Sequence, residues 1–342
     1  MTDILVVKCG SLGDVVRTSY ILPGLCEKYG DAAVHWLTGP DCLDLLRFNP
    51  YVSALHVMPV AEALRERTFD LVISLDDEVE ILDQITGITH RRLIGACLRD
   101  GKAWYSEDSS EWFDMGLISR FGRRRADELK KVNRRAHHQI FGDMLGIDIA
   151  SARFFNSELI EKRMLSRFDL AFFNIGINPG AGSRWPSKEL PVDETIALVG
   201  ALLGQRIEGK ETRVYLLGGR QEAERNAAFA AALASERLIE TGETYSLLEF
   251  AALIRCCDYL ITSDSLALHL AISQGVRNLS YYAPTSADEI GTFGSGTKVV
   301  SLSDDYCSYR PDADNSSLTA ARIMETMSAH LGLKNPPATD GI

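Results

Sequence analysis

The stretch DILVVKCGSLGDVV, residues 3–16, decides the fold. Residues 3–7 are almost all apolar, and a short apolar run that ends before a glycine-containing turn is typical of a buried strand in a parallel sheet. Helical spacing follows over residues 15–29, where Pro23 predicts a kink or a break. A strand, a turn and a helix in this order predict the first half of a βαβ unit.

The same alternation continues along the chain and predicts an α/β fold with parallel sheets. A change of character between residues 112 and 145 and a restart near residue 171 predict two successive α/β domains, 1–155 and 156–342. Further strands are expected at residues 33–37, 54–57, 71–75, 171–177, 213–217, 259–262, 279–282 and 298–302, and helices at 43–48, 192–205, 222–234, 266–274 and 316–331, the last with Ser316 as its N-cap.

Composition excludes several classes of protein. With 342 residues, 46% hydrophobic and 24% charged, the chain has the make-up of a globular protein of about two domains. Its net charge of -11 argues against general nucleic-acid binding, which needs a broad basic face. Seven cysteines without a CxxC spacing favour a reducing cytosol over a disulfide framework or a zinc ribbon. The start MTDILVVKCG predicts no secretory signal, and no apolar run approaches the ~20 residues of a membrane span.

One segment departs from this acidic background. Residues 120–135 contain eight Lys or Arg and two Asp or Glu, so they carry +6 and leave -17 for the rest of the chain. Such a run is usually the solvated face of a helix. Concentrated in an acidic protein, it also predicts a local site for an anionic partner.

The first strand-to-helix turn, CGSLGD, carries a carboxylate at the edge of the predicted sheet, where open parallel sheets bind ligands. Its glycines do not form the GxGxxG pattern, so a dinucleotide-binding interpretation loses its main support. Asp14 is either the N-cap of the next helix or a general base.

Three turns of the second domain suit a phosphate or a sugar. NPGAGSRWPSK, residues 178–188, offers backbone N–H groups and the Lys188 ammonium, unless it is a plain surface loop. Glu222 follows Gly218-Gly219. Its carboxylate either accepts hydrogen bonds from ribose hydroxyls or occupies a favourable position in the first turn of a helix. TSDSLALH, residues 262–269, begins a helix whose N-terminus attracts phosphate, with Asp264 or Ser265 as the alternative cap and His269 as a structural residue. Together these three turns predict a nucleotide ligand in the second domain, whereas Asp14 belongs to the first domain. A nucleotide on one domain and a carboxylate on the other predict a group-transfer reaction.

These segments together resemble glycosyltransferase family 9, the ADP-heptose:lipopolysaccharide heptosyltransferases. The resemblance is carried in order by ILVVKCGSLGDVVRTSYILPGL, NPGAGSRWPSKELP, LLGGRQEAE, LIRCCDYLITSDSLALHLAISQGV and YYAPTSADEIGTFG. It implies a GT-B fold of two facing Rossmann-like domains, with a C-terminal helix able to cross back to the first domain. It also implies inverting transfer of a heptose from ADP-heptose to an acceptor hydroxyl without a metal ion or a cofactor.

The resemblance and the motifs together nominate the site. Asp14 is expected to take the proton of the acceptor, Lys188 and the glycine-rich loop to hold the diphosphate, Glu222 the ribose, and Asp264 the heptose. The expected catalytic residues are Asp14 and Lys188; the donor-binding residues are Gly180, Ala181, Gly182, Ser183, Lys188, Glu222, Asp264, Ser265 and Leu266; the acceptor-binding residues are Ser11, Gly13, Arg120, Arg124 and Arg125.

Two departures from the family pattern leave two points undecided: the identity of the donor sugar, and whether the nearby loop supplies site residues. The family usually has Asp-Thr-Gly where this chain has Asp264-Ser265-Leu266, and Pro-Thr-Asp-Pro where it has Pro284-Thr285-Ser286-Ala287. The expected acceptor is an anionic glycan or glycolipid such as a lipopolysaccharide inner core. The expected place is the cytoplasm, with weak contact to the inner membrane. Alternatives are transfer of another sugar to a small molecule or protein, a GT-B-like nucleotide-sugar epimerase, and a non-catalytic nucleotide-sugar-binding protein.

Overall fold

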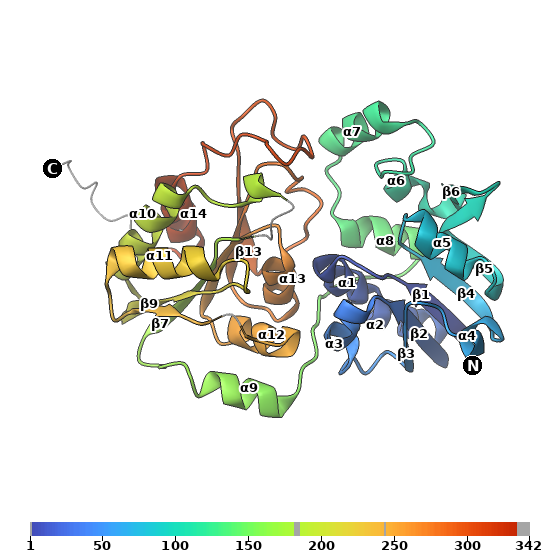
Figure 1. Ribbon diagram of the computed structural model, residues 1–342, viewed down its shortest axis with the longest axis horizontal. Coiled ribbons are helices and arrows are strands. Elements are labelled where there is room, and N and C mark those ends of the chain that lie inside the picture. Colours follow the sequence, from blue (N-terminus) through green and yellow to red (C-terminus); the bar gives the residue numbers. More distant parts are fainter. Residues whose placement is uncertain (1, 181–184, 243, 334–342) are drawn as a thin grey trace. The chain divides into compact units, whose positions relative to one another are not determined.

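The computed structural model describes residues 2–180, 185–242 and 244–333, and it divides into two compact units (Figure 1). Unit 1 consists of Met1–Ser157 with Asp288–Gly291, and unit 2 of Glu158–Ala287 with Thr292–Ile342. The sequence places the boundary at residue 155 and does not predict the return of four residues to unit 1. That return is a long-range contact, in which the His137 amide donates to the Glu289 carbonyl oxygen at 2.9 Å.

Unit 1 is built on a six-stranded sheet with the order β3-β2-β1-β4-β5-β6. The first five strands pair in parallel, and β6 pairs with β5 in antiparallel fashion. The strands are β1 (Thr2–Val7), β2 (Ala32–Thr38), β3 (Ala54–Val57), β4 (Thr68–Ser74), β5 (Thr89–Arg99) and β6 (Lys102–Tyr105). The helices are α1 (Leu12–Thr18), α2 (Leu22–Tyr29), α3 (Leu43–Leu46), α4 (Glu62–Arg65), α5 (Val79–Ile85), α6 (Ser110–Phe113), α7 (Arg123–Val132) and α8 (His137–Leu145), with 3-10 turns η1 (Ser19–Ile21), η2 (Pro40–Cys42) and η3 (Glu107–Ser109).

Unit 2 is built on a seven-stranded sheet, with parallel strands in the order β10-β9-β7-β11-β12-β13 and with β8 antiparallel to β9. Its strands are β7 (Phe173–Asn178), β8 (Arg206–Ile207), β9 (Lys210–Leu216), β10 (Leu238–Glu240), β11 (Tyr259–Ser263), β12 (Asn278–Tyr282) and β13 (Gly296–Val300). Its helices are α9 (Glu158–Leu165), α10 (Val192–Leu203), α11 (Ala223–Leu233), α12 (Leu247–Arg255), α13 (Leu266–Ser273) and α14 (Ala320–His330), with the 3-10 turn η4 (Pro186–Lys188).

The predicted α/β fold with parallel sheets is confirmed, and the strands that position the candidate site are buried. The β1 run Ile4–Val7 is fully buried, and so is most of β7 and β11. Burial on both faces explains why these strands read as continuous apolar runs rather than alternating ones. Each apolar run therefore ends where the strand leaves the core, which places the following turn at the sheet edge.

The C-terminal helix, α14, is part of unit 2, and its expected return to unit 1 stays a prediction. Through its last residue, His330, α14 belongs to unit 2, where it packs against α10 and β13. Its N-cap is Thr319, whose side chain accepts a hydrogen bond from the Arg322 amide, so the prediction of Ser316 as the cap is wrong. Ile323 and Met327 are buried in the core of unit 2, which holds the helix there.

Within the basic segment, residues 120–135, the structure has one helix, α7, and α6 and α8 lie on either side of the segment. Gly122, at φ 76°, stands before α7, and the extended Asn133 ends it. A positive φ interrupts the helical dihedral pattern and is tolerated by glycine, which has no Cβ.

In the described part of the chain, no helix has the length and apolar character needed to cross a membrane.

A hairpin in unit 1 is missing from the sequence-based prediction. β5 and β6 are joined at Asp100 and Gly101, both with positive φ (53° and 73°). Two consecutive positive φ values are typical of a type I′ turn, and Asp-Gly is among its favoured sequences. The signal was therefore present in the sequence as Asp-Gly between two extended runs.

Candidate active site

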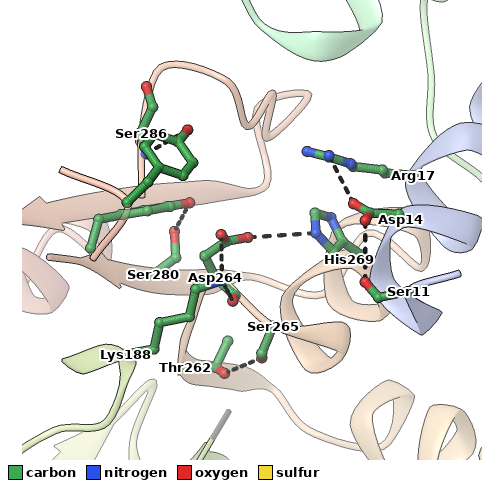
Figure 2. Close-up of polar contacts among 12 residues, drawn as sticks. Ser11, Asp14, Arg17, Lys188, Thr262, Asp264, Ser265, His269, Ser280 and Ser286 are labelled. Carbon is green, nitrogen blue, oxygen red and sulfur yellow. Dashed lines mark hydrogen bonds and ion pairs between the residues drawn. The ribbon is translucent and has the colours of Figure 1, made fainter. Parts of the chain in front are cut away.

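The Asp14 carboxylate lies in the first turn of α1, just beyond the carboxyl end of β1. Ser11, not Asp14, is the N-cap residue of α1, so the capping interpretation of Asp14 does not hold. The Ser11 hydroxyl donates to Asp14 Oδ2 at 3.2 Å, and Arg17 Nη2 lies 2.8 Å from Asp14 Oδ1 (Figure 2). With 34% of its side chain exposed, Asp14 is oriented by these partners and still accessible to a substrate.

Arg17 is itself held by an aromatic ring. Its guanidinium lies 5.5 Å from the centre of the Trp112 ring of α6, a cation–π distance. An arginine fixed in this way keeps the carboxylate it pairs with in one orientation. Trp112 thus contributes to the site through Arg17, a role that the sequence did not indicate.

In unit 2, the carboxyl ends of β7 and β11 are joined by a buried amide. Asn178 Nδ2 donates to the Gly180 carbonyl oxygen at 2.8 Å and to Thr262 Oγ1 at 3.2 Å. Thr262 Oγ1 in turn lies 3.0 Å from Ser265 Oγ (Figure 2). These bonds tie the turn after β7 to the start of α13. Sequence reasoning did not select Asn178, although a polar residue at the end of an apolar strand is a usable signal.

Lys188 and Asp264 form an ion pair at the same edge of the sheet of unit 2. Lys188 Nζ lies 2.9 Å from Asp264 Oδ2 and also donates to the Asp264 carbonyl oxygen at 2.8 Å (Figure 2). His269 Nε2 lies 3.6 Å from Asp264 Oδ1. Burial disfavours the charged carboxylate, but the Lys188 ammonium and His269 hold the pKa of Asp264 well below its usual range. Asp264 is therefore an anion next to the cation predicted to bind phosphate.

Glu222 is the N-cap residue of α11 and contacts both glycine-containing turns. Its Oε2 accepts a hydrogen bond from the Gly219 amide at 2.8 Å. A Cβ at Gly180 would stand 2.5 Å from Glu222 Cγ, so only glycine fits at that position without a shift. The turns after β7 and β9 thus come together around this carboxylate.

The motifs of unit 2 and the basic segment of unit 1 fall within one matched region. The model of the family described as "Glycosyltransferase family 9 (heptosyltransferase)" matches residues 120–319, more than half of the chain. The chain belongs to glycosyltransferase family 9. The predicted resemblance is confirmed, and this family 9 member is a glycosyltransferase.

Similar solved structures show the fold of this glycosyltransferase. The family 9 glycosyl transferase from Veillonella parvula DSM 2008 is 17% identical with a TM-score of 0.75, over 96% of this chain and 97% of that one. The E. coli ADP-heptose lps heptosyltransferase II is 17% identical with a TM-score of 0.70, over 97% and 98%. E. coli heptosyltransferase WaaC with ADP is 17% identical with a TM-score of 0.63, over 96% and 100%. They establish the GT-B fold. No curated protein matches the sequence of the chain.

The expected donor residues of this glycosyltransferase are partly described. Gly180, Lys188, Glu222 and Asp264 lie at the carboxyl edge of one sheet, on the turns after β7, β9 and β11. Ser265 is the N-cap residue of α13 and Leu266 its first residue, where backbone N–H groups lack acceptors within the helix. The expected loop residues Ala181, Gly182 and Ser183 lie outside the described residues.

The expected acceptor residues are placed in two parts of unit 1. Ser11 and Gly13 flank the start of α1, beside Asp14. The three arginines are all paired with acids: Arg120 with Glu107 and Asp114, and both Arg124 and Arg125 with Glu128. Glu128 is already counted in the net charge of +6 for residues 120–135, whereas Glu107 and Asp114 lie outside the segment and offset part of that charge. A role for these arginines in acceptor binding stays a prediction.

Among the described residues, no group of three or more His, Cys, Asp or Glu side chains is arranged to hold a metal ion. None of the seven cysteines, all of which lie among the described residues, forms a disulfide. Burial raises the pKa of Cys42 and of Cys256 to about 11, so both thiols stay protonated near neutral pH. The groups described above at the two sheet edges are carboxylates, an ammonium, a guanidinium, an imidazole, hydroxyls and backbone N–H groups.

Proposed function

We propose that this family 9 glycosyltransferase transfers a heptose from ADP-heptose to an acceptor hydroxyl with inversion at the anomeric carbon and without a metal ion. The observation that carries the proposal is the set of groups at the carboxyl edge of the unit 2 sheet. Lys188, Glu222 and the N-terminus of α13 match a diphosphate and a ribose. That the E. coli heptosyltransferase WaaC was solved with ADP supports the choice of nucleotide.

In the proposed reaction, Asp14 acts as the general base. Its carboxylate takes the proton of the acceptor hydroxyl while that oxygen forms a bond to the anomeric carbon. The bond between this carbon and the phosphate oxygen breaks, and its electron pair leaves with ADP. Attack from the face opposite the leaving group inverts the configuration.

Unit 2 would stabilise the charge that develops in this step. The sugar carbon gains oxocarbenium character as its bond to the phosphate breaks, as in glycoside hydrolysis. Negative charge grows on the departing diphosphate, so the Lys188 ammonium and the backbone N–H groups at the start of α13 bind it more strongly in the transition state. The diphosphate would compete with the Asp264 carboxylate for Lys188, whose Nζ lies 2.9 Å from Asp264 Oδ2. Released from Lys188, Asp264 would be available to the heptose hydroxyls.

The acceptor is proposed to be an anionic glycan or glycolipid of a lipopolysaccharide core. The support is the density of arginine and lysine at residues 120–135 in a chain of net charge -11. We expect the double charge reversal Arg124→Glu, Arg125→Glu to raise the acceptor KM more than the donor KM. Arg206→Glu, which alters an exposed ion-paired arginine of unit 2, is the control. Kinetics equal to the wild type would reject this acceptor surface.

We propose the cytoplasm as the compartment, with peripheral contact to the cytoplasmic face of the inner membrane. Seven cysteines, none of them in a disulfide, support a reducing environment. Contact with the membrane is tested by sedimenting the protein with vesicles of anionic and of zwitterionic phospholipid at low and high salt. Equal recovery with both kinds of vesicle would contradict an electrostatic contact.

The donor is tested by measuring release of the nucleoside diphosphate with a panel of nucleotide sugars and a lipopolysaccharide inner-core oligosaccharide. The mass of the product shows whether a heptose was added. Turnover of another donor, or of the donor alone, would favour another transferase or an epimerase.

The base is tested with Asp14→Asn against a matched control. We expect Asp14→Asn to lower kcat about 10²- to 10⁴-fold, because the proton acceptor is lost, while ADP binding in unit 2 persists. Asp44→Asn is the control, because Asp44 also forms an i,i+3 pair with an arginine at 2.8 Å and is 35% exposed. If both variants keep full turnover, Asp14 is not the base.

A further inference from the structure

The backbone that carries Lys188 is a single 3-10 turn. This turn, η4, is followed by Glu189 in an extended conformation. Three residues of 3-10 helix have too few hydrogen bonds of their own to fix a conformation. The position of the Lys188 ammonium at the carboxyl edge of the unit 2 sheet therefore depends on contacts that η4 and Glu189 make with other parts of the unit.

One contact comes from α11, the helix that begins after Glu222. Arg225 Nη1 lies 2.5 Å from Glu189 Oε2, and the side chains of this pair are 21% and 32% exposed. Arg225 also borders the turn after β7, because a Cβ at Gly180 would stand 2.6 Å from its Nη2. The ion pair thus links the backbone next to Lys188 to the helix and the glycine that are proposed to hold the nucleotide.

A second contact comes from the segment that leads to α14. Asn315 Nδ2 donates to the Glu189 carbonyl oxygen at 2.7 Å and lies 3.4 Å from the Ser187 carbonyl oxygen. The Ser187 amide in turn donates to the Pro311 carbonyl oxygen at 3.2 Å. The residues on both sides of Lys188 are therefore bonded to a segment that is distant in the chain.

Stability alone is a weak reason for the place of Arg225. Its Nε and Nη2 atoms are buried and have no hydrogen-bond partner among the described residues. Buried N–H groups without an acceptor cost free energy, and a partly buried ion pair returns little of it. Because both nitrogens are buried, a phosphate could reach them only after the chain rearranged. The geometry therefore favours an action of Arg225 through Glu189 over direct contact with a ligand.

We propose that Arg225 and Asn315 are positioning residues for the donor, which hold η4 so that the Lys188 ammonium stays where it would meet the diphosphate. Arg225 acts through the Glu189 side chain, and Asn315 acts through the carbonyl groups on both sides of Lys188. The proposal rests on the proposed function, in which Lys188 binds the diphosphate of ADP-heptose. Neither residue touches the donor in this role.

The test is a double-mutant cycle on the dissociation constant of ADP, measured by isothermal titration calorimetry. We expect Arg225→Gln and Asn315→Ala each to weaken ADP binding about tenfold, which is within the range found for coupled neighbours. In a Lys188→Met, Asp264→Asn background, the ammonium is absent and no unpaired carboxylate is left. There the same replacements should change the constant less than about twofold. The thermal unfolding midpoint of each variant shows that it is folded at the temperature of the titration.

Glu189→Ala separates positioning from a simple effect of charge. The Glu189 carboxylate repels a diphosphate, so its loss would strengthen ADP binding if only the charge mattered. Loss of the link to Arg225 should instead weaken ADP binding, as Arg225→Gln does. Arg225→Lys keeps a cation that can pair with Glu189 and should retain most of the affinity.

Arg277→Gln is the matched control. Arg277 Nη1 also pairs with a glutamate, Glu208, at 2.6 Å, but Arg277 lies directly before β12, at the opposite edge of the same sheet. Its replacement should leave the dissociation constant of ADP unchanged. Weakening equal to that of Arg225→Gln would contradict a local effect on Lys188.

The outcomes distinguish this proposal from the function on which it rests. If the wild type binds no ADP, or if Lys188→Met binds it equally well, the proposed donor site fails first and the positioning role fails with it. If ADP binding needs Lys188 but Arg225→Gln or Asn315→Ala binds ADP like the wild type, the role of that residue is overturned and Lys188 keeps its own. Equal weakening with and without Lys188, or tighter binding by Glu189→Ala, would also overturn the proposal, because the effect would not pass through Lys188.

Discussion

Lys188 and Asp264 illustrate how single residues combine stability with binding. Their side chains are 15% and 16% exposed, so each charge is largely removed from water and depends on the other. The same ammonium is the group proposed to meet the diphosphate. A ligand that draws Lys188 away must supply an equivalent negative charge, as a diphosphate does. This requirement favours an anionic ligand over a neutral one.

Replacing Lys188 should therefore destabilise the free protein. We expect Lys188→Met to lower the free energy of unfolding by about 3 kcal/mol, because it leaves the Asp264 charge without its ammonium. In the double variant Lys188→Met, Asp264→Asn, most of this loss should be recovered. Urea unfolding at pH 7 measures both. Equal stability of the single and double variants would show that the pair is not coupled in this way.

The pH dependence of this pair has a defined sign. The pKa of Asp264 is lowered in the folded protein. Its contribution to stability is therefore complete above the ordinary carboxyl pKa of about 3.9 and is lost as the pH falls through the lower folded value. When the wild type is unfolded at decreasing pH, the contribution of the Asp264 carboxylate to the free energy of unfolding should be lost only in strongly acidic solution.

At the scale of the element, α14 shows that a helix begins where its backbone is satisfied. Ser316 and Thr319 are both acceptable N-cap residues by type. Only Thr319 is extended at the helix start, with its hydroxyl bonded to the Arg322 amide. Leu318 and Ile323, on either side of Thr319, are buried in the core of unit 2, and their burial fixes the chain at the start of the helix.

The two candidate caps can be compared directly. We expect Thr319→Ala to lower the free energy of unfolding by about 1 kcal/mol, because a helix amide loses its acceptor. Ser316→Ala, the matched control on the preceding turn, should change it by less than about 0.5 kcal/mol. Chemical denaturation of the two variants is sufficient, and a larger loss for Ser316→Ala would contradict this choice of cap.

Neighbouring strands of unit 1 carry a histidine pair. His35 Nδ1 of β2 lies 3.0 Å from His56 Nε2 of β3, and the two rings are stacked. Burial, then the charge of Arg67, lowers the pKa of both rings below the ordinary value. The protein therefore favours their neutral forms.

We expect stability to fall as the pH decreases below the unfolded histidine value of about 6.5, because the unfolded chain binds protons that the folded pair resists. Replacing His56 with Gln should reduce this dependence between pH 7 and pH 5. His90→Gln on β5 serves as the control for the same replacement at a histidine outside the pair. Thermal unfolding across this range measures the effect, and identical slopes for wild type and His56→Gln would refute it.

At the scale of the whole molecule, the two α/β units carry different candidate groups. Each unit has its own sheet and its own core. The groups suited to a nucleotide belong to unit 2, and the proposed base belongs to unit 1. A nucleotide without its sugar should then be recognised by one unit alone.

We accordingly expect ADP to protect unit 2 from amide hydrogen exchange, mainly in the turns after β7, β9 and β11. At a concentration 100 times its Kd, ADP should stabilise the protein that binds it by about 2.7 kcal/mol. The turn before α1 in unit 1 provides the internal control. Protection of that turn with none in unit 2 would contradict the proposed donor site.

The sequence by itself determined the parallel α/β fold and the positions of the candidate turns, because apolar runs and glycine-containing turns are local patterns. It did not locate the hairpin at Asp100 and Gly101, although its signal was local too. Only the tertiary structure decided which charges meet: Lys8 with Asp76, and Lys188 with Asp264. These partners are 68 and 76 residues apart in the chain, and no local periodicity specifies a pairing over that separation. It arises when strands distant in sequence are aligned in one sheet, so that their carboxyl ends, and the side chains just beyond them, come together.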